Sequence, residues 1–108
     1  MSEVINLNIG DYVYIYLFDL EKSIKNMKKL RDDRFGKIVN KSIISNNNGN
    51  DVIVYDISLL NGKSLSYRSD NMTTNMIHIG ELVELIGRAE VSEEKRQLLL
   101  EQIQIILS

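Results

Sequence analysis

Two alternating segments meet in the stretch Val52-Ile-Val-Tyr-Asp-Ile-Ser-Leu-Leu-Asn-Gly-Lys-Ser-Leu-Ser-Tyr-Arg68. Apolar side chains occupy every second position of each segment: Ile53, Tyr55, Ile57 and Leu59, and then Leu65 and Tyr67. This period of two is typical of a β-strand with one buried face. Asn61 and Gly62 separate the segments and suit a two-residue type I′ turn. The stretch therefore predicts an antiparallel hairpin whose register follows from a two-residue turn.

Strand signals also occur on both sides of this hairpin. In residues 11–20, one face carries Val13, Ile15 and Leu17, and the other carries Tyr12, Tyr14 and Tyr16. Aliphatic side chains suit the interior of a curved sheet, so we expect the tyrosine face to point outward or to lie beneath another element. Residues 34–45 predict a second strand with a bulge near Asn40. Met76–Ile79 predicts a short last strand that ends at Gly80.

The C-terminal sequence predicts a helix with apolar side chains on two sides. Ser92 can accept hydrogen bonds from the first free amides, and the glutamates that follow it suit the positive end of the helix dipole. One apolar arc is made by Leu99, Leu100, Ile103, Ile106 and Leu107. Leu98 and Ile105 form a second ridge beside that arc. One buried face cannot use both the arc and the ridge, so we expect a homodimer whose interface contains Leu98 and Ile105, and a partner helix on this ridge is the alternative.

The segment after the first strand, residues 21–33, carries Ile24, Met27 and Leu30 at a spacing of three. This spacing predicts a short amphipathic helix, and a basic loop is the alternative. All these elements together predict a mainly β fold in a single domain of residues 1–108. Its parts are a five-stranded antiparallel barrel at about residues 10–87 and a C-terminal α-helix at about residues 92–107.

Composition narrows the class of protein. A chain of 108 residues can bury a core without metals or disulfides. It contains no cysteine, which excludes thiolate metal sites and cysteine nucleophiles and fits a reducing cytoplasm. The N-terminal sequence lacks a basic and apolar leader, and no segment approaches the roughly 20 apolar residues that a membrane helix needs. We therefore expect a cytoplasmic protein with no membrane partner. The asparagine-rich and isoleucine-rich, proline-free composition hints at an AT-rich genome such as that of a phage or mobile element.

Charge is concentrated in one part of the chain. Residues 22–41 contain eight cations and two carboxylates, a net charge of +6, so the remainder carries −8 of the total of −2. The cations are Lys22, Lys25, Lys28, Lys29, Arg31, Arg34, Lys37 and Lys41. Such a segment can orient an anionic partner over about 8 to 10 Å in cellular salt. We predict that these residues contact a partner, and a solvated loop that only adds solubility is the alternative.

Other candidate sites are weaker. His78 is the only histidine and stands between two isoleucines, so we expect its ring to face solvent or to be satisfied by a neighbour. With no cysteine to join it, His78 cannot anchor a zinc site, and we predict no metal. The glycines occur singly, without a phosphate loop or a dinucleotide fingerprint, so we predict no cofactor.

Three segments carry a resemblance to a known fold family. Gly10-Asp11-x-Val13, Gly36-Lys37-Ile38-Val39 and Tyr55-Asp56-Ile57-Ser58-Leu59-x-x-Gly62 together resemble the SH3-like barrels of the KOW and Tudor kind, over about residues 10–80. In those barrels the loops recognise a partner. The resemblance implies that the chain binds protein or nucleic acid and does not catalyse a reaction.

A narrower resemblance is to the MazF/PemK-type toxins. It rests on Gly10-Asp11, Arg34, Ser58 and the helix at about residues 92–107. It implies an endoribonuclease in which Arg34 and Ser58 act on RNA through the ribose 2′-OH. Phe35 stands where that family has proline.

The sequence thus predicts a non-enzymatic binding module or regulator that acts through a protein partner. Two alternatives remain open. The tyrosine face beside the basic segment combines the aromatic and basic side chains of a single-stranded nucleic-acid surface. We favour packing of this face beneath the C-terminal helix, because the apolar arc of that helix needs a surface to cover it. The endoribonuclease with Arg34 and Ser58 as catalytic residues is the other alternative.

Overall fold

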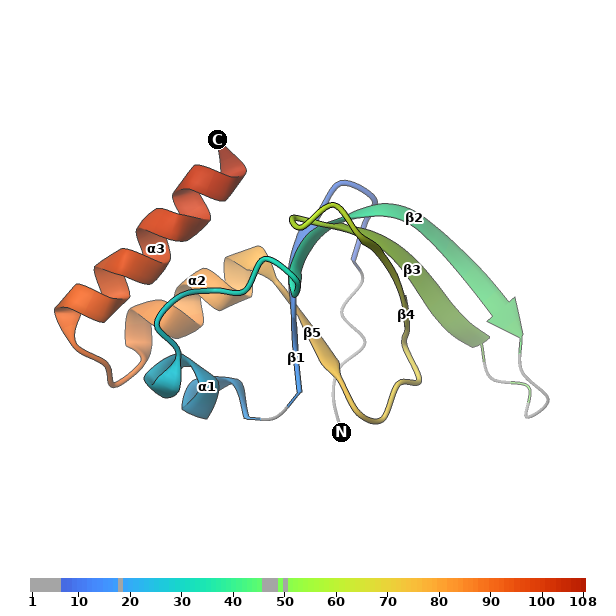
Figure 1. The fold of residues 1–108 in the computed structure, drawn as a ribbon. Coiled ribbons are helices and arrows are strands. Elements are labelled where there is room, and N and C mark those ends of the chain that lie inside the picture. Colours follow the sequence, from blue (N-terminus) through green and yellow to red (C-terminus); the bar gives the residue numbers. More distant parts are fainter. Residues whose placement is uncertain (1–6, 18, 46–48, 50) are drawn as a thin grey trace.

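The computed structural model describes residues 7–17, 19–45, 49 and 51–108. The elements in chain order are β1 (Tyr12–Tyr16), α1 (Leu20–Asn26), β2 (Phe35–Ser45), β3 (Asp51–Leu59), β4 (Ser64–Arg68), β5 (Asn75–His78), α2 (Ile79–Arg88) and α3 (Glu93–Leu107). The three helices gather on one side of a bent sheet, and the far ends of β2 and β3 project away from them (Figure 1). No helix in this described part of the chain is long and apolar enough to span a membrane.

The five strands form one antiparallel sheet with the order β4-β3-β2-β1-β5. The predicted antiparallel strands and C-terminal helix are confirmed, and the predicted closure into a barrel is wrong. β4 and β5 are the two edges, and within the described residues no backbone pairing joins them. The sheet nevertheless curls strongly, because Tyr67 of β4 and Met76 of β5 both pack against the same apolar cluster. β5 ends after four residues and passes directly into α2, so the curled sheet stays open at this edge.

The central hairpin forms with a different turn from the predicted one. Ile57 lies opposite Leu65, and Tyr55 lies opposite Tyr67. A two-residue turn at Asn61 and Gly62 would instead place Leu65 opposite a serine. Gly62 has a φ of +87°, but no described non-glycine residue has a positive φ, so the type I′ turn is wrong. The chain uses a longer turn because this register keeps apolar residues paired on one face.

Two apolar clusters lie on opposite faces of the sheet. The cluster on the concave face contains Leu7, Val13, Ile15, Ile38, Tyr55, Ile57 and Leu59. The cluster beneath the helices contains Tyr14, Phe35, Leu20, Ile24 and Leu30, together with residues of α2 and α3. The predicted interior positions are therefore confirmed for Val13 and Ile15. Leu17 is the exception and is 40% exposed, because β1 ends at Tyr16 and the chain leaves the sheet there.

The helices differ in how well the sequence predicts them. α3 begins as expected, with the Ser92 hydroxyl accepting a hydrogen bond from the Lys95 amide. The predicted short helix exists as α1, and Asp19 caps it by accepting hydrogen bonds from the amides of Glu21 and Lys22. The sequence does not predict α2, because Gly80 follows an alternating segment and resembles the end of a strand. The predicted bulge is confirmed, since the register of β2 against β3 shifts between Ile38 and Asn40.

Candidate binding pocket

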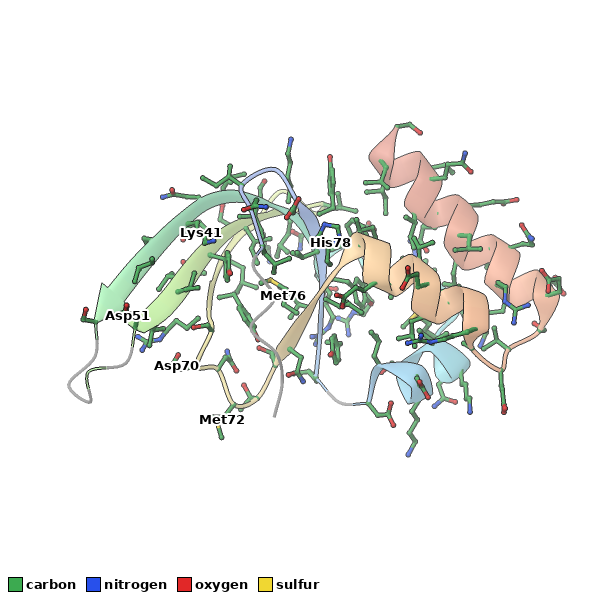
Figure 2. All side chains as sticks on the ribbon, turned by 180° about the vertical axis from the view of Figure 1, so that it is seen from behind. Lys41, Asp51, Asp70, Met72, Met76 and His78 are labelled. Carbon is green, nitrogen blue, oxygen red and sulfur yellow. The ribbon has the colours of Figure 1, made fainter. Side chains whose placement is uncertain are left out.

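The eight cations of residues 22–41 do not form one continuous surface. The Lys37 ammonium lies over the Tyr12 ring, 5.8 Å from its centroid. Lys41 lies on the bent part of β2, far from α1 (Figure 2), where its ammonium donates a hydrogen bond to the Leu7 carbonyl at 3.0 Å. Lys25 lines a smaller hollow between α1 and the end of α2. Lys28 is exposed in the segment after α1. The remaining four cations, Lys22, Lys29, Arg31 and Arg34, line a single pocket.

This pocket lies between the end of β1, α1 and residues 27–34, and its volume is about 480 Å³. Its apolar and aromatic lining comes from Tyr14, Ile15, Tyr16, Leu17 and Met27. Its polar lining comes from Asp19, Ser23 and Asn26, in addition to the four cations. A volume between about 300 and 1,000 Å³ is usual for ligand pockets. The hollow is therefore large enough to receive a group bigger than a single carboxylate.

Short-range interactions fix the walls of the pocket. The buried side chains of Leu20 and Ile24 anchor α1 on the helix side of the sheet. Residues 27–34 then return across β1 to β2, and the Ile15 amide donates to the Arg34 carbonyl at 2.9 Å. In the middle of this segment, Leu30 is buried and its backbone is hydrogen-bonded by the side chain of Gln102 on α3. The pocket is thus held by three separate parts of the chain.

Some of the charges around the pocket are already engaged. The Arg31 guanidinium donates two hydrogen bonds to the Asp33 carboxylate, at 2.9 and 2.6 Å. These hydrogen bonds hold the pKa of Asp33 below its ordinary value. Asp19 is occupied by the amides at the start of α1. Among the ion pairs formed by the described residues, none includes Lys22, Lys29 or Arg34. These three cations are available to an anionic ligand.

The tyrosine rings of β1 are largely covered by other parts of the protein. Tyr14 is only 2% exposed, and its ring packs against Phe35 with the centroids 6.1 Å apart. Its hydroxyl accepts a hydrogen bond from the Arg31 amide at 3.3 Å. Burial raises the pKa of Tyr14, and burial also raises the pKa of Tyr16. Tyr12 also packs against Phe35, so the stripe lies largely beneath other elements.

The alternative catalytic pair does not meet in this pocket. Arg34 lines it, whereas Ser58 is exposed on β3 opposite Lys37 and does not line it. The His78 ring is hydrogen-bonded by a neighbour, which is one of the two arrangements that the sequence predicts. Its Nδ1 accepts a hydrogen bond from the Gly80 amide at 3.0 Å, and its Nε2 lies 3.6 Å from Oδ1 of Asp11. Figure 2 shows His78 at the junction of β5 and α2. Across residues 7–17, 19–45, 49 and 51–108, no three acidic or histidine side chains are grouped so that they could hold a metal ion.

The predicted second ridge of the C-terminal helix is exposed. Leu98 is 52% exposed and Ile105 is 74% exposed, whereas Leu99 and Ile103 between them are buried. α3 therefore uses one side for the core beneath the helices and presents the other side to solvent. This places Leu98 and Ile105 where a second chain could reach them.

The cations of the pocket can be recognised in the sequence, whereas its apolar lining and its support cannot. Leu17 and Met27 follow the spacing of buried faces, and Gln102 belongs to no recognisable motif. Asp19 is a signal for the pocket in the sequence, because an aspartate shortly after the end of β1 marks the start of α1, which lines the pocket. Comparison with known protein families, with curated protein sequences and with solved structures finds no match to this chain.

Proposed function

We propose that this protein is a small, non-enzymatic binding module that recognises an acidic segment of a partner protein through the pocket beside α1. The observation that carries the proposal is the placement of Lys22, Lys29 and Arg34 around one hollow, with no ion pair among the described residues using them. Cations that share a site repel one another, and a carboxylate placed between them offsets that repulsion.

The distribution of charge favours a protein partner over a nucleic acid. A phosphate backbone needs cations along a track, together with exposed rings on which bases can stack. In this protein Lys37 lies over Tyr12, Lys41 lies on a distant part of β2, and Tyr14 is buried. Outside residues 22–41 the chain carries a net charge of −8, which repels an extended polyanion. A short acidic peptide needs only the local cluster.

The position of the pocket supports the proposed relation to SH3-like barrels. The pocket is built largely by the connection between β1 and β2, and loops between strands are the recognition elements in those barrels. We place the module in the cytoplasm, because a chain without cysteine suits a reducing compartment. We also propose that two copies associate through Leu98 and Ile105. The support is the exposure of these two side chains on a helix whose opposite side is buried.

The test is a binding titration with a fluorescein-labelled octapeptide of glutamate and, in parallel, with a single-stranded RNA of eight nucleotides. Lys29→Glu should weaken binding of the peptide about tenfold or more, because it replaces an attraction by a repulsion at the pocket. Lys63→Glu is the matched control, since Lys63 lies in the turn between β3 and β4 and makes the same change of charge. It should leave the affinity within about twofold of the parent protein.

The outcomes separate the candidate functions. Equal loss in Lys29→Glu and Lys63→Glu would show that only net charge matters, and the proposed pocket would be discarded. Tight, salt-dependent binding of RNA and not of the peptide would make the protein a nucleic-acid-binding module. If a long single-stranded RNA is cut by the parent protein but not by Arg34→Ala and Ser58→Ala, the endoribonuclease replaces the binding module.

A further inference from the structure

We infer that the pocket receives a large apolar side chain of the partner, with carboxylates on the neighbouring residues held by the surrounding cations. The recognised segment is then one in which acidic and large apolar residues alternate, and a run of acidic residues alone is a poorer ligand. This inference rests on the proposed function, and it adds the chemistry of the residue that enters the pocket.

The size and the apolar lining of the pocket favour a large apolar side chain as its occupant. A volume of about 480 Å³ is far more than one carboxylate group fills. The side chains of Leu17 and Met27 contribute apolar surface to it, and Leu17 is 40% exposed. A carboxylate cannot use this surface, because transfer out of water is unfavourable for a charged group that contacts only apolar atoms. An aromatic or long aliphatic side chain can use it, because burial removes apolar surface of both partners from water.

The cations of the pocket lie on more than one segment of the chain. Lys22 lies on α1, whereas Lys29 and Arg34 lie towards opposite ends of residues 27–34. The cations therefore come from two of the segments that line the pocket, α1 and residues 27–34, and the same pocket carries the apolar side chains of Leu17 and Met27. Asp19 also lines the pocket, but its carboxylate accepts hydrogen bonds from two amides of α1. Cations on two segments can contact carboxylates at more than one position of a ligand whose apolar side chain enters the pocket.

Hydrogen bonds hold the walls of the pocket in place before a ligand binds. Leu30, between Lys29 and Arg31, is fixed by two hydrogen bonds to Gln102. The chain at Arg34 is fixed by the hydrogen bond from the Ile15 amide. A hollow whose walls are already ordered loses little conformational entropy when a ligand binds. The pocket can therefore discriminate by shape as well as by charge.

The experiment compares three octapeptides by anisotropy, all with the same fluorescein label and the same blocked termini, so that they differ only in their side chains. The first alternates aspartate with phenylalanine, the second alternates aspartate with serine, and the third alternates asparagine with phenylalanine. The first should bind about tenfold more tightly than either of the others, because only it satisfies both the cations and the apolar lining.

Variants of the lining then locate the effect. Leu17→Ser should weaken binding of the aspartate–phenylalanine peptide about fivefold or more and leave the aspartate–serine peptide unchanged. Leu65→Ser is the control, because Leu65 is 38% exposed on β4 and does not line the pocket. Met27→Gln gives a second variant of the lining with nearly the same volume. Circular dichroism establishes that each variant is folded before its affinity is compared.

Failure of this inference differs from failure of the proposed function. Equal affinity for the two aspartate peptides, with no effect of Leu17→Ser or Met27→Gln, overturns the apolar part and leaves an acidic-peptide module. Equal affinity for the aspartate–phenylalanine and asparagine–phenylalanine peptides overturns the role of the flanking carboxylates. No binding of any peptide overturns both proposals.

Discussion

The side-chain amide of Gln102 on α3 forms two hydrogen bonds with the backbone of Leu30. The Leu30 amide donates to Oε1 at 2.8 Å, and Nε2 donates to the Leu30 carbonyl at 2.9 Å. One amide side chain thus pairs with both the N–H and the C=O of Leu30. Leu30 is buried, so these hydrogen bonds replace those that water would otherwise make. The last helix thereby holds the segment that forms one wall of the pocket, 72 residues earlier in the chain.

Replacement of Gln102 should therefore lower the stability of the fold. Gln102→Leu removes both hydrogen bonds and should lower the free energy of unfolding by about 1 to 3 kcal/mol, because it leaves the backbone groups of Leu30 unsatisfied. Urea unfolding measures this change. Gln104→Leu is the matched control, since Gln104 is exposed on the same helix. An equal effect of the two substitutions would show that the contact with Leu30 contributes nothing specific.

Gly36 predicts a second difference in stability. A Cβ atom at Gly36 would lie 2.6 Å from Cγ2 of Ile57 and 2.7 Å from the Ser58 carbonyl oxygen. Gly36→Ala should therefore destabilise the fold by about 1 to 3 kcal/mol through overpacking between β2 and β3. Gly87 in α2 has open space around the same position, so Gly87→Ala should stabilise by about 0.5 to 1 kcal/mol. Thermal unfolding of both variants measures this contrast, and a loss of stability in Gly87→Ala would contradict it.

Tyr14 predicts a dependence of stability on alkaline pH. Burial raises the pKa of its hydroxyl above the ordinary value of 10.0, so the folded state holds this proton more tightly than the unfolded state. The contribution to stability is complete below a pH of about 10 and is lost as the pH rises through the folded pKa. Between about pH 9 and pH 11, the parent protein should lose more unfolding free energy than Tyr14→Phe does. Urea unfolding across this range tests it, and parallel losses would contradict the assignment.

The exposed ridge on α3 predicts a change of molecular mass. Leu98→Glu combined with Ile105→Glu should convert a dimer to a monomer, because two charges replace the apolar contact. Val83→Glu on α2 is the control, since Val83 is 37% exposed and lies outside the ridge. Sedimentation equilibrium measures the mass of each variant. A parent protein that already sediments as a monomer would contradict the proposed self-association.

Much of the sheet could be predicted because alternation fixes which side chains share a face. Val13, Ile15 and Ile57 lie on the concave face as the sequence indicates. The predicted type I′ turn is wrong. Asn61 and Gly62 favour a two-residue turn, whereas the pairing of Ile57 with Leu65 requires a longer one. A local turn preference is weaker than the burial of a whole strand face, and only the register reveals which of them decides.

α2 shows why an element can be missed although its signal is present. Ile79, Leu82 and Ile86 recur at helical spacing and are buried together on one side of α2. The preceding residues alternate like a strand, and Gly80 looks like a break, so the change of period falls inside one apolar run. Because His78 caps the helix with its side chain, no serine, threonine or aspartate marks the start.

Of the candidate site, only the cations could be predicted from the sequence. Lys22, Lys29 and Arg34 were identified from the basic segment, but so were Lys37 and Lys41, which the fold places elsewhere. A linear sequence does not reveal which members of a charged run share a hollow. That depends on the ends of β1 and α1, and on a contact from α3 that is distant in the chain.

A two-dimensional amide NMR titration with the aspartate–phenylalanine octapeptide shows whether the pocket beside α1 is the recognition surface. If it is, saturable shifts will be confined to the amides of the pocket, above all Leu17, Lys22, Met27 and Lys29. Shifts that spread over Lys37, Lys41 and Lys63 and spare the amides of Leu17 and Met27 would contradict it.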